Sequence, residues 1–231
     1  MEKSKEEVVV REPKQRKHDA HERNHMKKIT LFALLGTGLL ISGCFPTSIN
    51  PLYTEQDLAF DPALAGVWHG GDGDAAAAKE RWAFEKAGDK NYKLIYTDKD
   101  GKAGQFDVHR LKLGDTLFLD FFPGDRGDEE TKRSDLYQYH FVPVHSFAKV
   151  SQTDSALKLS FLSLEWLGKL LEKNPRAIRH EMVGPTNEHT LVFTASTKDL
   201  QKFVLKHMGN KEAFLEPIDL KRERAEPKTE K

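Results

Sequence analysis

Apolar and polar residues alternate along much of the chain between residues 66 and 122. The runs in which every second position is apolar are 79–86, 91–98, 105–111 and 116–122. A period of two is typical of β-strands that bury one face. Turn dipeptides separate these runs, and Asp100-Gly101 is the clearest hairpin signal among them. Together with the segment 66–70, the pattern predicts an antiparallel meander of five strands.

The second half of the chain begins with a further strand pattern. The segment 136–150 predicts a long strand that is bent at Pro143, because proline cannot donate to the hydrogen-bond ladder. Its expected hairpin partner is 156–163, and two shorter strands are expected at 177–184 and 189–195.

Two segments of the second half have helical spacing instead. They are 164–174, with Ser163 as N-cap, and 197–208, which begins with the capping pair Ser196 and Asp199. The predicted fold class is therefore mainly β (α+β), an antiparallel meander that forms a partly closed, barrel-like sheet. The two helices of the C-terminal half are expected to cover this sheet.

Residues 26–44, MKKITLFALLGTGLLISGC, follow a different pattern. A short basic head precedes an uncharged, mostly apolar run of thirteen residues. Such a run suits the core of a signal peptide and is too short for a membrane span, which needs about 20 residues. The stretch ends in Ile41-Ser42-Gly43-Cys44, which resembles the lipobox of bacterial lipoproteins. The resemblance implies that Cys44 accepts a diacylglyceryl group and that cleavage occurs just before it.

Cys44 is also the only cysteine of the chain, so an exported form has no partner for an internal disulfide. The alternative interpretation is a buried apolar helix that happens to end in Gly-Cys. A lipoprotein would be held at the membrane by its acyl chains, palmitate among them, because two or more chains make attachment lasting. Residue 45 is Phe and not the Asp that typically retains lipoproteins at the inner membrane. This favours the periplasmic face of the outer membrane if the source is diderm.

The signal divides the chain into five parts. Residues 1–25 are a product of an upstream start or a disordered leader, 26–43 the signal peptide, 44–63 a tether, 64–217 the β-rich globular domain and 218–231 a disordered charged tail. Some docking of the tether is expected through Leu52, Tyr53, Leu58 and Phe60.

Charge argues against nucleic acid as a partner. The full chain has 36 basic and 36 acidic residues, and residues 1–43 hold nine of the basic and six of the acidic ones. The mature chain therefore keeps 27 basic and 30 acidic residues, a formal net charge of −3. A mildly acidic domain has no electrostatic reason to bind nucleic acid. Membrane attachment would then rest on Cys44, without help from a polybasic patch.

No motif of the mature domain specifies a reaction. A nucleophile elbow, a phosphate loop and a zinc-protease motif are all missing from the sequence, and Asp98, Asp100 and Gly101 have the wrong spacing for a calcium loop. We therefore predict no catalytic residue, no metal site and no cofactor. Among the histidines, a cleft that joined His109, His140 or His145 to Asp120 would favour an enzyme after all.

Gly66-Val67-Trp68 resembles the Gly-x-Trp that opens the barrel of lipocalin-like (calycin) proteins, and a meander of alternating strands follows in both. That resemblance implies a barrel that holds a small apolar ligand, although an eight-stranded barrel can equally be filled by its own side chains. Two functions remain open. One is a non-enzymatic envelope module, binding or structural, whose partner is an envelope protein or a wall or lipid component. The alternative is a lipocalin-like carrier of a small hydrophobic ligand.

The segment 117–122 is apolar on both alternating faces. Phe118 and Phe122 lie opposite Leu117, Leu119 and Phe121. Either the two helices cover this second face, or Phe118 and Phe122 form an exposed candidate surface for a partner.

Overall fold

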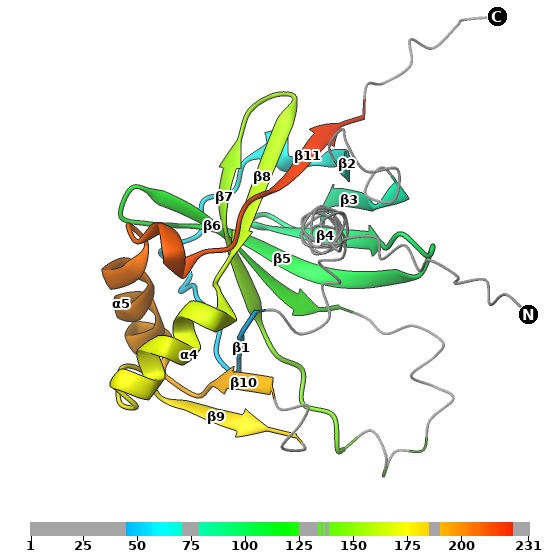
Figure 1. Ribbon diagram of the computed structural model, residues 1–231. Helices are drawn as coiled ribbons and strands as arrows, with labels where there is room; N and C mark the ends of the chain where they lie inside the picture. Colours follow the sequence, from blue (N-terminus) through cyan, green and yellow to red (C-terminus); the bar gives the residue numbers. More distant parts are fainter. Residues whose placement is uncertain are drawn as a thin grey trace, which may run out of the picture. The chain divides into compact units, whose positions relative to one another are not determined.

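The computed structural model describes residues 45–70, 79–124, 134, 136, 139–184 and 190–223. Within this part of the chain, eight strands form a closed antiparallel barrel in the order β11-β2-β3-β4-β5-β6-β7-β8 (Figure 1). The strands are β2 (Gly66–Gly70), β3 (Arg81–Lys86), β4 (Asn91–Thr97), β5 (Ala103–Leu113), β6 (Thr116–Pro123), β7 (Ser146–Gln152), β8 (Ala156–Phe161) and β11 (Ile218–Arg222). This barrel confirms the predicted fold class, and the five-strand meander is β2 to β6.

A second layer lies against one side of the barrel (Figure 1). It contains the helices α4 (Leu164–Lys173) and α5 (Thr197–His207) and a small sheet of β1 (Thr47–Ser48), β10 (Thr190–Phe193) and β9 (His180–Val183). Two short 3-10 helices, η1 (Pro62–Leu64) and η3 (Lys211–Ala213), complete the described elements. Both predicted N-caps are present, since the hydroxyls of Ser163 and Ser196 accept from the third backbone N–H of their helices.

The inside of the barrel is filled by the barrel's own side chains. Because successive residues of a strand point to opposite faces, one alternating set from every strand points inward. This inner core consists of Leu64, Trp68, Trp82, Phe84, Tyr92, Leu94, Val108, Leu119, Phe121, Ala148, Val150, Leu157, Leu159, Phe161 and Leu220. The exposed fraction of every one of these side chains is 7% or less.

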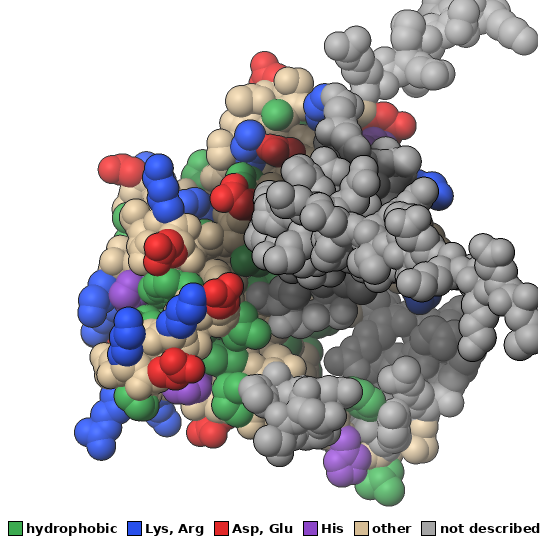
Figure 2. Space-filling model, viewed as in Figure 1, with side chains coloured by type: hydrophobic (Ala, Val, Ile, Leu, Met, Phe, Trp, Pro, Cys, Tyr) green, Lys and Arg blue, Asp and Glu red, His purple; other side chains and the backbone are tan. Residues whose placement is uncertain are grey.

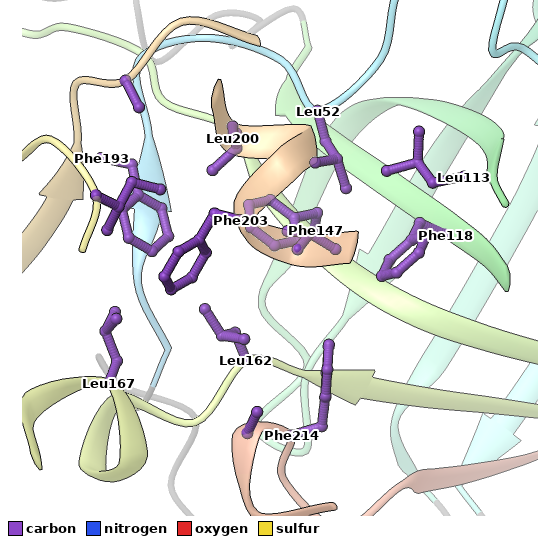
Figure 3. Close-up of a cluster of buried hydrophobic side chains, with 14 of the residues drawn as sticks. Leu52, Leu113, Phe118, Phe147, Leu162, Leu167, Phe193, Leu200, Phe203 and Phe214 are labelled. Atoms are coloured by element: carbon purple, nitrogen blue, oxygen red, sulfur yellow. The ribbon is translucent and has the colours of Figure 1, made fainter. Parts of the chain in front are cut away.

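A second apolar cluster lies between the barrel and the helices. This outer core consists of Leu52, Leu111, Leu113, Phe118, Phe147, Leu162, Leu167, Leu171, Ile178, Leu191, Phe193, Ala195, Leu200, Phe203, Val204, Ala213 and Phe214. Figure 3 shows Phe118 and Phe147 of the barrel on the same side as Phe203 of α5. The outward apolar positions of β5 to β7 therefore need the helices as cover, and the helices bury their apolar stripe there.

One end of the barrel is closed by an arginine on a tryptophan. The Arg222 guanidinium lies 4.1 Å from the centre of the Trp68 ring and donates to the carbonyl oxygens of Ala63, Ala65 and Asp154. The indole N–H of Trp68 donates to the Leu64 carbonyl at 3.0 Å. These contacts fix η1 across the end of the barrel.

The glycine of the Gly-x-Trp triplet makes this closure possible. Gly66 has φ of +137°, a conformation that side chains rarely adopt, and an added Cβ would lie 2.4 Å from Nη1 of Arg222. The triplet therefore has a structural reason at this position: Gly66 leaves room for the arginine that packs on Trp68.

Three expectations about boundaries need correction. The tail 218–231 was expected to be disordered, but residues 218–222 form β11, which pairs with β8 and β2 and closes the barrel. Five residues with only two apolar positions, Ile218 and Leu220, give too short a pattern to distinguish a strand from a charged tail. The expected long strand 136–150 is also shorter, since β7 starts at Ser146. Before it, His145 forms an isolated bridge with Ser48.

The third correction concerns the tether. Residues 45–63 lie against the barrel, and the four docking side chains pack as expected: Leu52 is fully buried in the outer core, Tyr53 stacks on His109, Leu58 bridges to Leu111 and Phe60 stacks on Tyr92. The packed domain thus begins before the expected boundary at residue 64. Whether this segment connects the domain to a membrane anchor stays a prediction.

The closure predicts opposite effects for two Gly→Ala changes. Gly66→Ala should lower the free energy of unfolding by more than about 1 kcal/mol, because of its positive φ and the clash with Arg222. Gly168→Ala, inside α4 with no atom near its added Cβ, should raise the free energy of unfolding by about 0.5–1 kcal/mol. Urea denaturation of both variants measures these values. Equal effects of the two changes would contradict the role given to Gly66.

Candidate functional site

The residues of the predicted lipobox, Ile41, Ser42, Gly43 and Cys44, lie outside the described residues. The description begins one residue later, at Phe45. The Phe45 ring stacks on Phe161 of β8 with ring centres 4.3 Å apart, and Pro46 is buried. The predicted lipidation site is therefore followed at once by a residue that is packed into the fold.

Phe45 belongs to a group of aromatic rings at the barrel end opposite η1. From Phe161 the group continues to Phe121 at 5.9 Å, to Trp82 at 6.3 Å and to Tyr96 at 4.7 Å between ring centres. We call these five residues the aromatic end. It differs from the closed end because Phe45 and Tyr96 remain partly exposed, whereas the rings of Trp68 and Tyr92 near η1 are fully buried.

The aromatic end contains one polar group without a partner. The side chain of Trp82 is 6% exposed, and its indole N–H has no hydrogen-bond partner among the described residues. A buried unpaired donor costs about 1–3 kcal/mol relative to a satisfied one. Burial, and then the nearby charges of Glu80 and Asp98, raise the pKa of Tyr96 to about 12, so its hydroxyl stays neutral. The five rings are therefore uncharged and carry one buried, unpaired donor, although charged residues such as Glu80 and Asp98 lie nearby.

A groove of about 610 Å³ lies elsewhere, on the outer surface between the β7–β8 hairpin and residues 211–217. Its lining includes Lys149, Lys158, Lys211 and Glu216. Lys149 lies over the Phe214 ring at 4.6 Å. Because charged and polar side chains line much of this groove, it differs from the apolar cavity that a carrier of hydrophobic molecules would need.

A polar cluster lies on the outer face of the barrel, where β5, β6 and the start of β7 meet. Asp120 of β6 is fully buried, and its Oδ1 accepts from Nδ1 of His145 at 2.6 Å. Its Oδ2 accepts from the backbone N–H of Leu52 at 2.8 Å. His145 is held in turn by two backbone hydrogen bonds with Ser48, of 2.7 and 2.8 Å. This cluster joins His145 and Asp120, which are 25 residues apart in the sequence.

His109 is the other histidine close to Asp120, which is its direct cross-strand neighbour. The Tyr53 ring stacks on His109 at 4.3 Å, and the Tyr53 hydroxyl lies 3.5 Å from Nε2 of the imidazole. Burial lowers the pKa of His109, against the opposing pull of Asp120, Asp107 and Glu55. Burial, followed by the charge of Asp120, raises the pKa of Tyr53 to about 12. At neutral pH His109 and Tyr53 are therefore uncharged.

An Asp–His pair can orient a general base, so this arrangement is the one that would favour an enzyme. Its other contacts hold residues 48–52 against the barrel. Both carboxylate oxygens of Asp120 hold parts of the fold, and the Ser48 hydroxyl donates to the Asn50 carbonyl at 2.7 Å and not to a histidine. In the described residues the pair thus works as a latch that fastens residues 48–52 to the barrel.

The remaining candidate residues are separated from this cluster. His140 lies on an exposed turn, and Nδ1 of His180 is 2.9 Å from the Ile178 carbonyl. Among the described residues, no group of three or more His, Cys, Asp or Glu side chains is arranged to hold a metal ion. Phe118 is fully buried in the outer core, so it is not part of an exposed partner surface, and the alternative that the helices cover it holds. Phe122 is half-buried, with its ring 4.5 Å from that of His145.

Neither the surface charge nor the comparison with known proteins points to a further candidate site. Figure 2 shows basic and acidic side chains intermixed over the helical side of the molecule. In the described residues, no helix has both the length and the apolar character needed to cross a bilayer. No family model, no curated protein and no solved structure matches the chain.

The latch predicts a large and specific effect of Asp120→Asn. The change weakens two hydrogen bonds of a buried group, and a buried polar group that loses a partner costs about 1–3 kcal/mol, so the free energy of unfolding should fall by that amount. Hydrogen exchange of the Leu52 amide should accelerate beyond the change expected from stability alone, because its acceptor is weakened. Asp107→Asn, on the same face of the barrel but half-buried, is the matched control and should change stability by about 0.5 kcal/mol at most. Unchanged protection of Leu52 would refute the latch.

Proposed function

We propose that this protein is a lipid-anchored component of the bacterial cell envelope and that its barrel domain acts by binding or as a structural module, without catalysis. The observation that carries the proposal is the lipobox-like Ile41-Ser42-Gly43-Cys44 after a basic head and an apolar run. The domain's net charge of −3 after residue 43 gives it no attraction to nucleic acid. Phe45 in place of Asp favours the outer membrane if the source is diderm.

The contacts of the Asp120–His145 pair support the non-enzymatic part of the proposal. A catalytic dyad needs a histidine nitrogen that is free to exchange a proton with a substrate or nucleophile. Among the described residues, the Ser48 hydroxyl donates to the Asn50 carbonyl at 2.7 Å, so it is not placed as a nucleophile for His145. Both carboxylate oxygens of Asp120 bind groups of the fold, the His145 ring and the Leu52 amide, which supports a structural role for the pair.

Membrane partitioning of a tagged protein tests the anchor. Cys44→Ala should remain uncleaved before residue 44 and should incorporate no labelled fatty acid. Ser42→Ala, which keeps a small residue at the lipobox, should be processed and labelled like the unchanged protein. Intact mass should show no residue of 1–43 in the mature chain. Fatty-acid label that persists in Cys44→Ala would overturn the proposal.

The second candidate function is a carrier of a small hydrophobic molecule, and one observation favours it. The unpaired indole N–H of Trp82 lies among aromatic rings, where an acceptor atom on an apolar ligand would satisfy it. The fully buried rings of Trp68, Phe84 and Tyr92 occupy the remaining barrel, so such a ligand would be confined to the aromatic end.

Native mass spectrometry of the detergent-extracted protein distinguishes the two functions. A carrier should retain a small molecule, and Trp82→Phe should lower its occupancy because the donor is lost while the ring remains. Trp166→Phe, on α4 and outside the barrel, should leave occupancy unchanged. Absence of any bound molecule from the unchanged protein would count against the carrier and leave the non-enzymatic module.

A further inference from the structure

We propose that the domain rests on a lipid bilayer with a defined orientation, in which the aromatic end of the barrel and the C-terminal end of β9 face the lipid. This inference rests on the proposed lipidation of Cys44. It adds an interaction surface and its occupant, a phospholipid bilayer, to the proposed function.

The proposed anchor residue lies directly next to packed residues of the domain. Consecutive Cα atoms lie about 3.8 Å apart, so the Cα atom of an acylated residue 44 lies at that distance from the Cα atom of Phe45. Phe45 is fixed by its stacking on Phe161, and Pro46 is buried. Directly afterwards, β1 pairs with β10 and Ser48 is bonded to His145. The acyl chains therefore bring the bilayer to the surface of the domain at Phe45.

The register of the small sheet brings the end of β9 to the side on which Phe45 lies. β1 runs parallel to β10 with Thr47 opposite Val192. Phe45 and Thr190 therefore lie toward the same edge of the sheet, the one that is formed by the ends of the strands. β10 is antiparallel to β9 with Thr190 opposite Val183, which brings the end of β9 to that edge as well. Two strand spacings of about 4.8 Å separate β1 from β9, so this end lies about 10 Å across the sheet from β1.

The end of β9 exposes apolar side chains. Met182 and Val183 at the end of β9 are 49% and 54% exposed. Their successive side chains point to opposite faces of the strand, so apolar surface is presented on both sides. At the same end of the barrel, the turn at residues 98–102 carries two aspartates and two lysines, so its charges balance and do not repel anionic headgroups. Exposed apolar side chains about 10 Å across the sheet from β1, the strand that follows the proposed anchor, suit the bilayer interface.

The orientation makes the two ends of the barrel unequal. The β3–β4 turn at residues 87–90 lies at the opposite end, near η1, because β3 runs away from the aromatic end and β4 returns to it. That turn should stay in water. The aromatic end, in contrast, would open toward the lipid, which is where a small hydrophobic ligand would be available.

Site-directed fluorescence on the lipidated protein tests the orientation. With Cys44 acylated, Val183→Cys and Asp89→Cys each supply one reactive thiol for an environment-sensitive probe. The proteins are placed in phosphatidylethanolamine–phosphatidylglycerol vesicles with and without a lipid that carries a quencher at its headgroup. The probe at position 183 should be quenched several-fold more strongly than the probe at position 89.

Each other outcome decides against the orientation. Equal quenching at both positions, or stronger quenching at 89, would overturn it while leaving the anchor intact. A probe at 183 that is shielded from water but not quenched by lipid would show that a protein partner or a second copy covers this edge. Vesicle flotation and intact mass on the same samples separate the two proposals, because a chain that carries no acyl group would refute the anchor and the orientation together.

Discussion

The described fold depends on one buried carboxylate. Asp120 sits on the outer face of β6 between Phe118 and Phe122, in a strand that is otherwise apolar at these positions. A buried charge is costly unless it is paired and hydrogen-bonded, and Asp120 meets this condition only when His145 and the Leu52 amide are both in place. The hydrogen bonds that Asp120 needs therefore fix the positions of two segments that are distant in the sequence, the one with Leu52 and the one with His145.

The second layer follows from that selection. Once Leu52 is held, residues 50–52 exchange hydrogen bonds with α5 and the residues before it. The Asn50 side chain donates to the Ala195 carbonyl, whereas the Pro51 and Leu52 carbonyls accept from Thr197 and Gln201. The same helix places Leu200, Phe203 and Val204 in the outer core. An isolated helix of eleven residues would be marginal in water, so α5 gains its stability from this docking. The Asp120 carboxylate, residues 50–52 and α5 thus depend on one another.

The local elements could be predicted from the sequence, and their closure could not. Alternation placed β3 to β6 because each run is long enough for a period of two to be recognised, and the serine caps of α4 and α5 have a local signal. The strand β11 has five residues, of which only Leu220 is fully buried, and its partners β8 and β2 are distant in the sequence. The expected sixth strand was too long because Pro143 and Val144 continue its apolar pattern, while His145 pairs with Ser48 instead of a barrel strand.

The candidate site shows the same division. Asp120, His109 and His145 could be singled out as residues worth joining, since their side-chain chemistry is visible in the sequence. That Leu52 supplies the second hydrogen bond could not be foreseen, because a backbone amide has no sequence signature. This contact is what fastens residues 48–52 to the barrel, and the sequence gives no sign of it.

The latch also links the proposed anchor to the whole domain. A lipid-anchored domain usually gains freedom from the residues between its anchor and its first packed element, since a flexible linker explores more space as it lengthens. Here Phe45 already packs on Phe161, β1 follows within two residues, and Asp120 holds Leu52 further along. Any force or restriction at the membrane would therefore reach the barrel through rigid structure. The buried carboxylate of β6 would then determine both how the domain holds together and how it is presented to the membrane.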